Sequence, residues 1–180
     1  VDAFNTQQDL LSFDSQSTGG GVRLGKNISE FDSLNLRYSF NNVKVSGVSA
    51  ANITENFKNE TRVTSRVAPT FVRDTRDNYL NPTAGWRHVL GFQLAGLGGA
   101  KFTKSVYEVT YYHPLVGKLV GAAHARVNYA EGYGGEALPR FERYFMGGPT
   151  SLRGFTIKNI GPKDSAGNPV GGSQSLLLNL

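Results

Sequence analysis

The sequence contains no cysteine, and only one methionine and one tryptophan occur among its 180 residues. Without cysteine the chain forms neither disulfide bonds nor thiolate metal sites. Hydrophobic residues make up 39% of the chain. No apolar run approaches the ~18 residues that a transmembrane helix requires. This argues against a helical membrane protein, but not against a membrane β-barrel, whose strands are apolar on one face only.

The charge balance is basic, with a net charge of +5 at pH 7. A basic chain can bind nucleic acid or an anionic lipid surface. Here the cations are scattered through alternating segments, and no platform of aromatic side chains accompanies them, so we do not expect nucleic acid as a partner. No signal peptide is visible, and residues 1–3 read as the middle of a strand. We therefore expect the sequence to be an excised fragment.

Alternation of apolar and polar residues predicts β-strands along most of the chain, because successive side chains of a strand point to opposite faces. The pattern is clearest where Leu34, Leu36, Tyr38 and Phe40 alternate with polar residues. Similar patterns cover residues 62–71, 86–95, 107–112, 119–129 and 175–180, and weaker ones cover residues 1–7 and 15–25. The sequence predicts an all-β fold of about eight antiparallel, up-and-down strands, many approaching the ~9–11 residues that cross a bilayer at a tilt.

The predicted connections differ between the two ends of the sheet. Short turns are expected at residues 27–32, 74–85 and 114–117, and loops at residues 8–14, 47–59, 99–102 and 131–171, of which 99–102 is short. Short periplasmic turns and longer extracellular loops are typical of outer-membrane barrels. Pro69 lacks an N–H for the ladder, so a bulge or a broken pairing is expected there.

One face of the predicted sheet is charged and polar. It carries Arg37, Arg62, Arg66, Arg87, Glu108, His124, Arg126 and Asn128. Burying such groups unpaired in a sandwich core would cost several kcal/mol for each charge. A soluble sheet would turn this face to bulk water, whereas a membrane barrel would turn it to a wet lumen and present Leu, Phe, Tyr and Val to lipid. Strand length and the asymmetry of the turns favour the barrel.

The longest predicted connection, residues 131–171, far exceeds the ~12–15 residues usual for an unstructured loop. It holds too many aromatic and aliphatic side chains for a disordered segment. Gly147, Gly148 and Pro149 predict a turn within it, because glycine tolerates positive φ and proline fixes φ. We expect the loop to pack into another part of the protein.

A guanidinium group stands between apolar side chains in the middle of this loop, in the motif Leu152, Arg153, Gly154 and Phe155. Most loop arginines are solvated, and that interpretation stays open. The apolar neighbours favour a second one, in which the loop folds back into the lumen and Arg153 pairs with a carboxylate of the barrel wall.

Three motifs occur in the same order as in the BamA-like family of outer-membrane barrel assembly factors, which this chain resembles. They are residues 77–85, residues 132–135, and residues 152–155 followed by 160–163, which is similar to the sixth extracellular loop of that family. The resemblance places Asp77, Pro82 and Gly85 in a periplasmic turn. It makes Gly161 and Pro162, with the turn at residues 147–149, residues that shape the loop.

The resemblance implies that residues 1–180 form part of the wall of a transmembrane barrel of roughly sixteen strands. An open half barrel leaves two unsatisfied edges, which lipid does not tolerate, so the missing strands must come from the rest of the protein. The family's partner for Arg153 lies on strands past Leu180. Glu108 is the one strongly placed acid on the predicted inner face, so a partner within this chain is not expected.

The function that the resemblance implies is the folding and insertion of nascent outer-membrane proteins in the bacterial outer membrane. The implied partners are these clients, the lipid bilayer with its lipopolysaccharide, and accessory lipoproteins that bind periplasmic domains not present in this sequence. The fragment alone is expected to be inactive. Two alternatives stay open: a secretion pore of the same superfamily that exports a partner protein, and a soluble β-sandwich binding module.

Residues that would support enzymatic chemistry are not arranged for it. His88, His113 and His124 are dispersed, whereas a metal ion needs converging ligands. Ser151 has neither a glycine elbow nor a partnered histidine. Residues 132–135 lack the lysine and the following helix of a phosphate-binding loop. We expect no enzyme activity and no catalytic, cofactor or metal site.

Overall fold

The computed structural model is a single antiparallel sheet of eight strands, ordered from β1 to β8 as in the sequence. It describes residues 1–10, 13–47, 60–149, 151–165 and 167–180. The strands are β1 (Asp2–Leu10), β2 (Phe13–Asn27), β3 (Asp32–Ser46), β4 (Glu60–Asp74), β5 (Gly85–Gly99), β6 (Phe102–Pro114), β7 (Val120–Gly132) and β8 (Gln174–Asn179), with one 3₁₀ turn, η2 (Arg140–Glu142). The predicted all-β, up-and-down arrangement is confirmed. Among the described residues no helix is long and apolar enough to span a membrane.

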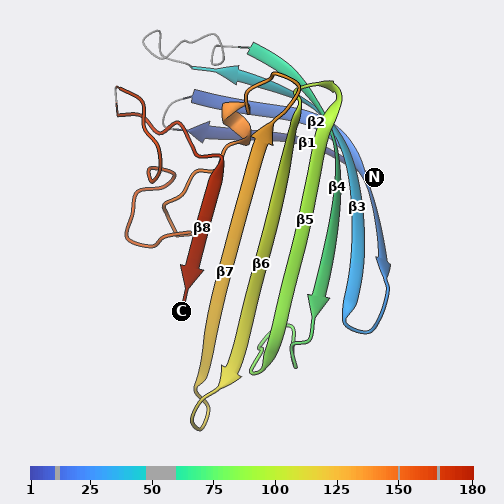
Figure 1. Cartoon of the computed structure of the whole chain (residues 1–180), viewed down its shortest axis with the longest axis vertical. Coiled ribbons are helices and arrows are strands. Elements are labelled where there is room, and N and C mark those ends of the chain that lie inside the picture. Colours follow the sequence, from blue (N-terminus) through green and yellow to red (C-terminus); the bar gives the residue numbers. More distant parts are fainter. Residues whose placement is uncertain (11–12, 48–59, 150, 166) are drawn as a thin grey trace.

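The connections gather at the two ends of the sheet (Figure 1). Residues 28–31, 75–84 and 115–119 join neighbouring strands at one end. At the other end residues 100–101 join β5 to β6, and residues 133–173 join β7 to β8. In Figure 1 this long connection, coloured orange to red, lies at the upper end of the sheet beside β8. Apart from Gly47, the loop predicted over residues 47–59 lies outside the described residues.

Residues 8–10 and 13–14, which were predicted as part of a loop, belong to β1 and β2, while residues 11–12 lie outside the described residues. β1 and β2 stay in register along their whole length, from the pair Asp2–Gly21 to the pair Leu10–Phe13. The prediction failed because this stretch has no apolar alternation. A strand needs that alternation only where one face is buried or meets lipid, while the backbone ladder alone is enough elsewhere.

The sheet has two chemically different faces. The inner face is defined here as the one that contacts the long loop, and the outer face as its opposite. On β3 the side chains of Leu36 and Phe40, on the outer face, are 43% and 48% exposed. Ser39 and Asn41, which alternate with them on the inner face, are 4% and 5% exposed. The division of the faces therefore follows the sequence prediction.

The apolar side chains of the outer face form a continuous belt across the strands. Its exposed members are Val22, Leu24, Leu34, Leu36, Tyr38, Phe40, Trp86, Leu90, Phe92, Leu94, Tyr107, Val127, Tyr129, Leu176 and Leu178. Monomeric soluble proteins rarely expose a contiguous apolar patch of more than a few hundred Å². A sheet with this outer face is suited to contact with hydrocarbon.

The belt ends within the strands. On β3 the chemistry of the two faces changes after Phe40: Val43 and Val45 are buried on the inner face, and Asn42 and Lys44 are exposed on the outer face. The strand thus continues past the apolar belt toward the end that carries the long loop. Sequence alternation alone predicted this strand from residue 33 to about residue 41.

The broken pairing expected at Pro69 is found on one side of the strand. Pro69 keeps its place opposite Leu36 in the ladder with β3, but the ladder with β5 passes from the pair Val67–Leu94 to the pair Thr70–Gly91 without pairs at residues 68 and 69. The register of β4 with β5 shifts at another place, between Thr64 and Arg66, opposite β5 residues 96–98. Glycine in this part of β5 allows the extra residues to be accommodated.

Candidate functional site

The base of the long loop packs on the only cluster of buried apolar side chains among the described residues. This cluster consists of Ala95, Ala100, Phe102, Ala130 and Leu138, with Tyr144 packed against it. Tyr133, just after β7, donates a hydrogen bond from its hydroxyl to the carbonyl of Ala95 over 2.8 Å. A Cβ at Gly96 would collide with that hydroxyl. The small residues of β5 therefore form a seat for the loop.

A buried carboxylate holds the loop to the inner face. Glu142, at the end of η2, has a side chain only 7% exposed, and its Oε1 lies 3.1 Å from Nη2 of Arg66 on β4. Its Oε2 lies 3.2 Å from Nζ of Lys104 on β6, which also donates to the Glu142 carbonyl over 2.9 Å. We call Arg66, Glu142 and Lys104 the inner bridge. Charge-assisted hydrogen bonds of this kind are about twice as strong as neutral ones.

A second carboxylate repeats this arrangement closer to the start of the loop. Oε2 of Glu136 lies 3.5 Å from Nη2 of Arg62 on β4, and its Oε1 lies 3.7 Å from Nζ of Lys101, which directly precedes β6. We call these three residues the outer bridge, although they lie, like the inner bridge, on the inner face of the sheet. Their side chains are 28–44% exposed, so solvent screens these pairs more than those of the inner bridge.

The aromatic ring of Tyr144 adds to the inner bridge. Nζ of Lys104 lies 4.7 Å from the centre of the Tyr144 ring, a cation–π contact. Burial, and then the charge of Glu142, raise the pKa of the Tyr144 hydroxyl to about 12. Burial also lowers the pKa of the neighbouring Arg143. The base of the loop is thus packed against the wall and largely shielded from water.

The loop turns sharply at Gly147 and Gly148, whose φ angles are 108° and 96°. Hydrogen bonds close the turn: Gly147 N donates to the Ser151 hydroxyl over 2.8 Å, and Gly148 N donates to the Leu152 carbonyl over 3.1 Å. Pro149 is exposed at the corner. A side chain at Gly147 would require an unfavourable φ and would collide with the carbonyl of Thr156.

The tip of the loop, which carries the predicted Arg153 motif, is exposed. Leu152 is half-buried, whereas Arg153, Gly154 and Phe155 are exposed, Phe155 at 59%. Among the ion pairs of the described residues, none involves Arg153. The pairing of Arg153 with a wall carboxylate therefore stays a prediction.

The returning half of the loop, which leads to β8, contains the predicted residues Gly161 and Pro162. Gly161 and Pro162 are exposed, with φ of 125° at Gly161. The carbonyl of Pro162 accepts a hydrogen bond from Val170 N over 2.9 Å. Bridges between Tyr144 and Gly172 and between Met146 and Ile160 hold the outgoing and returning halves of the loop together. A cavity of 260 Å³ lies between the loop and strands β7 and β8.

At the opposite end of the sheet, Asp77 organises the turn between β4 and β5. Its Oδ1 accepts hydrogen bonds from Thr83 N at 2.9 Å and Ala84 N at 3.1 Å, and its Oδ2 accepts one from the Thr83 hydroxyl. The hydroxyl first, and then the two amides, lower the pKa of Asp77 to about 2. Pro82 is half-buried within the turn. Gly85, with φ of 109°, ends it, and a Cβ there would collide with the Thr75 carbonyl.

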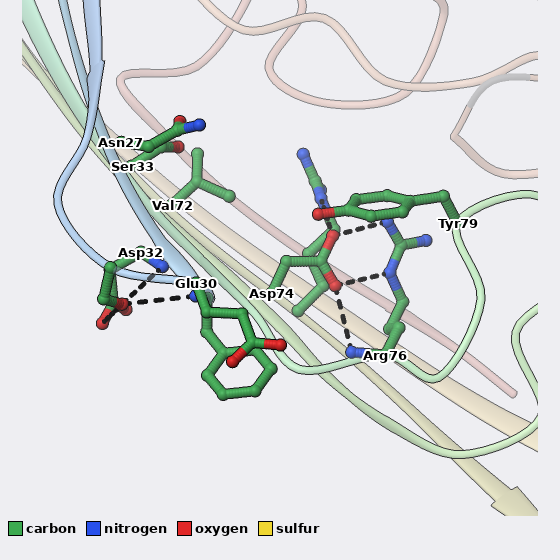
Figure 2. Close-up of a pocket in the computed structure, with 11 residues that line it drawn as sticks. Asn27, Glu30, Asp32, Ser33, Val72, Asp74, Arg76 and Tyr79 are labelled. Carbon is green, nitrogen blue, oxygen red and sulfur yellow. Dashed lines mark hydrogen bonds and ion pairs between the residues drawn. The ribbon is translucent and has the colours of Figure 1, made fainter.

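The same end of the sheet holds a polar cavity of 350 Å³ between the β2–β3 and β4–β5 turns. Figure 2 shows Arg76 beside the Asp74 carboxylate, with the ring of Tyr79 above the pair. The Arg76 guanidinium donates to the two oxygens of Asp74 over 2.8 and 2.6 Å, and it lies 5.5 Å from the centre of the Tyr79 ring. These contacts fix the geometry of the turn.

A charge network continues from this turn up the inner face. Glu108 on β6 accepts hydrogen bonds from Arg87 on β5 over 3.2 Å and from Nε of Arg126 on β7 over 2.7 Å, and His124 Nε2 lies 3.7 Å away. One carboxylate thus faces two arginines. Within the described ranges, no group of three or more His, Asp or Glu side chains is placed to hold a metal ion.

The family of the chain follows from comparison with known proteins. The family model of the Omp85 superfamily domain matches residues 1–180, the whole chain. The chain belongs to the Omp85 superfamily. The outer membrane protein assembly factor BamA of Nitratidesulfovibrio vulgaris is 27% identical over 185 residues, covering 99% of this chain and 23% of that protein. The mouse sorting and assembly machinery component 50 homolog is 30% identical over 110 residues, covering 60% of this chain and 23% of that protein.

A solved structure has the same fold. The crystal structure of BamA from Haemophilus ducreyi lacking POTRA domains 1-3 matches with a TM-score of 0.83 at 21% identity, over 97% of this chain and 39% of that one. This Omp85 domain therefore has the fold of a segment of the BamA barrel, which excludes the β-sandwich alternative. The chain spans 23% of the length of the curated relatives it matches.

Sequence reasoning missed the two carboxylates that hold the loop of this Omp85 domain. The one charged contact that it predicted, Arg153 with a wall carboxylate, stays a prediction; in the contacts that the structure shows, the wall supplies the cations and the loop supplies Glu136 and Glu142. One feature of the sequence could have indicated these contacts. Arg62 and Arg66 lie on the predicted inner face with no predicted acid beside them, so carboxylates from another segment were needed to pair with them.

Proposed function

We propose that this Omp85 domain is part of a bacterial outer-membrane protein that folds and inserts nascent β-barrel proteins. The observation that carries the proposal is the two-faced sheet, whose outer face is apolar and whose inner face is charged and holds the long loop. The relatives named above are assembly components, which supports the same role. The match to the bacterial protein covers 99% of the chain and the match to the mouse protein 60%, which supports a bacterial source.

The proposed mechanism uses strand edges and breaks no covalent bond, so the protein would not be an enzyme. β1 and β8 are the terminal strands of the sheet, and each has one edge with no neighbour among the described residues. In a bilayer such edges must be paired with further strands. The full-length barrel would offer a strand edge to an incoming client by β-augmentation, as in other proteins that add a strand to a sheet.

The exposed loop tip would dock inside the barrel. In this proposal Leu152 and Phe155 pack against the lumen wall, and Arg153 pairs with a carboxylate on strands beyond Leu180. The side chain of Phe155 is 59% exposed in this chain, which supports a packing partner on other strands of the full barrel. Gly147, Gly148, Pro149, Gly161 and Pro162 would shape the loop for this contact. Asp77, Pro82 and Gly85 would hold the periplasmic turn.

The partners follow from this location. Nascent outer-membrane proteins would be the clients, and the outer face would contact lipid and lipopolysaccharide. Accessory lipoproteins would bind periplasmic segments of the full-length protein. We do not expect nucleic acid, because several inner-face arginines, including Arg62, Arg66 and Arg87, are paired with the carboxylates of Glu136, Glu142 and Glu108.

The test reconstitutes the full-length protein in lipid vesicles and adds an unfolded outer-membrane barrel. Insertion is measured as the fraction of client that migrates as a folded, heat-modifiable species on an unheated gel. Faster client folding than in empty vesicles supports the proposal. Transport of a polypeptide across the vesicle wall without faster client folding would show instead the secretion pore of the same superfamily. If the protein showed neither faster client folding nor polypeptide transport, the proposal would be overturned.

A further inference from the structure

The two bridges at the loop base have the same geometry. In each one, a loop carboxylate joins an arginine of β4 to a lysine at or near the start of β6. Arg62 and Arg66 are four residues apart, and because side chains alternate along a strand they share the inner face. The bridges are therefore two successive rungs of a ladder that crosses the sheet.

The ladder passes over β5. That strand lies between β4 and β6, and neighbouring strands are about 4.8 Å apart, so β4 and β6 are separated by about 10 Å. A carboxylate that lies above β5 can be reached from both neighbouring strands only by long side chains, such as the arginines of β4 and the lysines at or near the start of β6. At this level β5 presents Ala95, whose carbonyl accepts the Tyr133 hydrogen bond, and Gly96, where a side chain would displace the Tyr133 hydroxyl. The wall is thus complementary to the loop in shape and in charge.

Burial makes the inner bridge the stronger rung. The side chains of Glu142, Lys104 and Arg66 are 7%, 16% and 19% exposed. If the Glu142 charge were removed, two partly buried cations would face each other without an acid. Truncating one partner of a buried charge pair is costly for this reason.

The base and the tip of the loop are held differently. The base contacts β4, β5 and β6 through the bridges and Tyr133, whereas the tip at residues 152–157 is largely exposed and is held by hydrogen bonds within the loop, such as Lys158 N to Gly147 O at 3.3 Å. The direction in which the tip points is therefore set at the base.

We propose that Glu136 and Glu142 are positioning residues, which clamp the loop base across β4–β6 and so present the tip to the wall strands beyond this chain. The role in client insertion rests on the proposed function, but the clamp itself does not. Both sides of this contact belong to the same chain: two carboxylates of the loop form ion pairs with four cations, two of β4 and two at or near the start of β6.

The experiment measures local opening of the loop in the full-length protein in lipid vesicles. Amide hydrogen exchange is followed at residues 140–146 in the wild type, in Glu142→Gln and in Glu136→Gln/Glu142→Gln. We expect about tenfold faster exchange in Glu142→Gln, a change equivalent to about 1.4 kcal/mol of local opening energy. Glu142→Asp keeps the charge and should restore most of the protection. Glu131→Gln is the matched control, because this exposed carboxylate on β7 bonds only the Tyr129 hydroxyl among its described contacts.

A second measurement follows the tip itself. This chain has no cysteine, so spin labels can be placed at Thr156 on the tip and Lys44 on β3 by substitution, and their distance distribution recorded. Loss of both carboxylates should broaden the distribution, while the gel mobility of the folded barrel stays unchanged. Client insertion should slow in the same variants and recover in Glu142→Asp.

The outcomes separate the two proposals. Wild-type exchange and an unbroadened distribution in the double variant would overturn the positioning role, whatever the insertion activity. Equal acceleration by Glu131→Gln would also overturn it, because the effect would then come from net charge. A wild-type protein that inserts no client would overturn the proposed function and leave the exchange result interpretable.

Discussion

The claim that the outer face meets hydrocarbon predicts a large difference between two neighbouring positions on β3. Leu36 points outward and Asn35 points inward, so Leu36→Arg and Asn35→Arg add the same charge at the same height on opposite faces. We expect the first change to destabilise the full-length barrel strongly and the second to have little effect.

The size of the effect follows from the position of Leu36 in the apolar belt. On the outer face of β3 the belt is bounded by Asp32 and Asn42. Their separation of ten residues gives about 34 Å along the strand and, at a tilt of about 40°, about 25 Å across the membrane, the height of a typical apolar band. Leu36 lies about 10 Å from the nearer boundary on the same scale, close to the midplane. Arginine at the midplane costs about 2–4 kcal/mol.

The assay is a urea titration of the full-length protein in lipid vesicles, followed by the mobility of the folded barrel on an unheated gel. Leu36→Arg should lower the free energy of unfolding by about 2–4 kcal/mol. Asn35→Arg, facing the wet lumen, should change it by less than about 1 kcal/mol. If Asn35→Arg proved as costly as Leu36→Arg, the assignment of the faces would be wrong.

Three further changes test the turn, the loop base and the loop tip. The pKa of Asp77 is lowered from 3.8 to about 2, so its hydrogen bonds to Thr83 and Ala84 contribute stability above pH 3.8 and lose it as the pH falls toward 2. Amide protection of Thr83 should decline over that window in the wild type and not in Asp77→Asn, and a flat wild-type profile would contradict this. Phe102 is the largest fully buried side chain of the part of the chain that the structure describes, so Phe102→Ala should cost about 3–5 kcal/mol in the urea titration. Phe102→Leu should be clearly milder, and equal effects of the two changes would argue against a tightly packed loop seat. Arg153→Ala should cost about 3–5 kcal/mol if its partner is buried in the full barrel, and an unchanged unfolding profile with unchanged client insertion would count against that pairing.

Strand pattern and loop chemistry were predictable to different degrees. Alternation in segments such as residues 33–41 and 86–95 gave the strands and their two faces, because the period of two is a local property of the backbone. It failed at residues 8–10 and 13–14, where the apolar alternation is absent while the ladder continues, and after Phe40, where the apolar residues change to the inner face. The broken pairing at Pro69 was predictable because proline has no N–H to donate, whereas the register shift between Thr64 and Arg66 was not, because it depends on the partner strand, here the glycine-rich end of β5.

The amino-acid sequence alone determined that this chain is a two-faced antiparallel sheet with one long, ordered loop, since both properties follow from side-chain order along the backbone. Only the tertiary structure decided what holds that loop. Lys104 and Glu142 are 38 residues apart in the chain, and they meet because β7 runs back along β6 and the loop then folds onto the inner face. A pairing of this kind depends on the register of remote segments, and no local pattern encodes it.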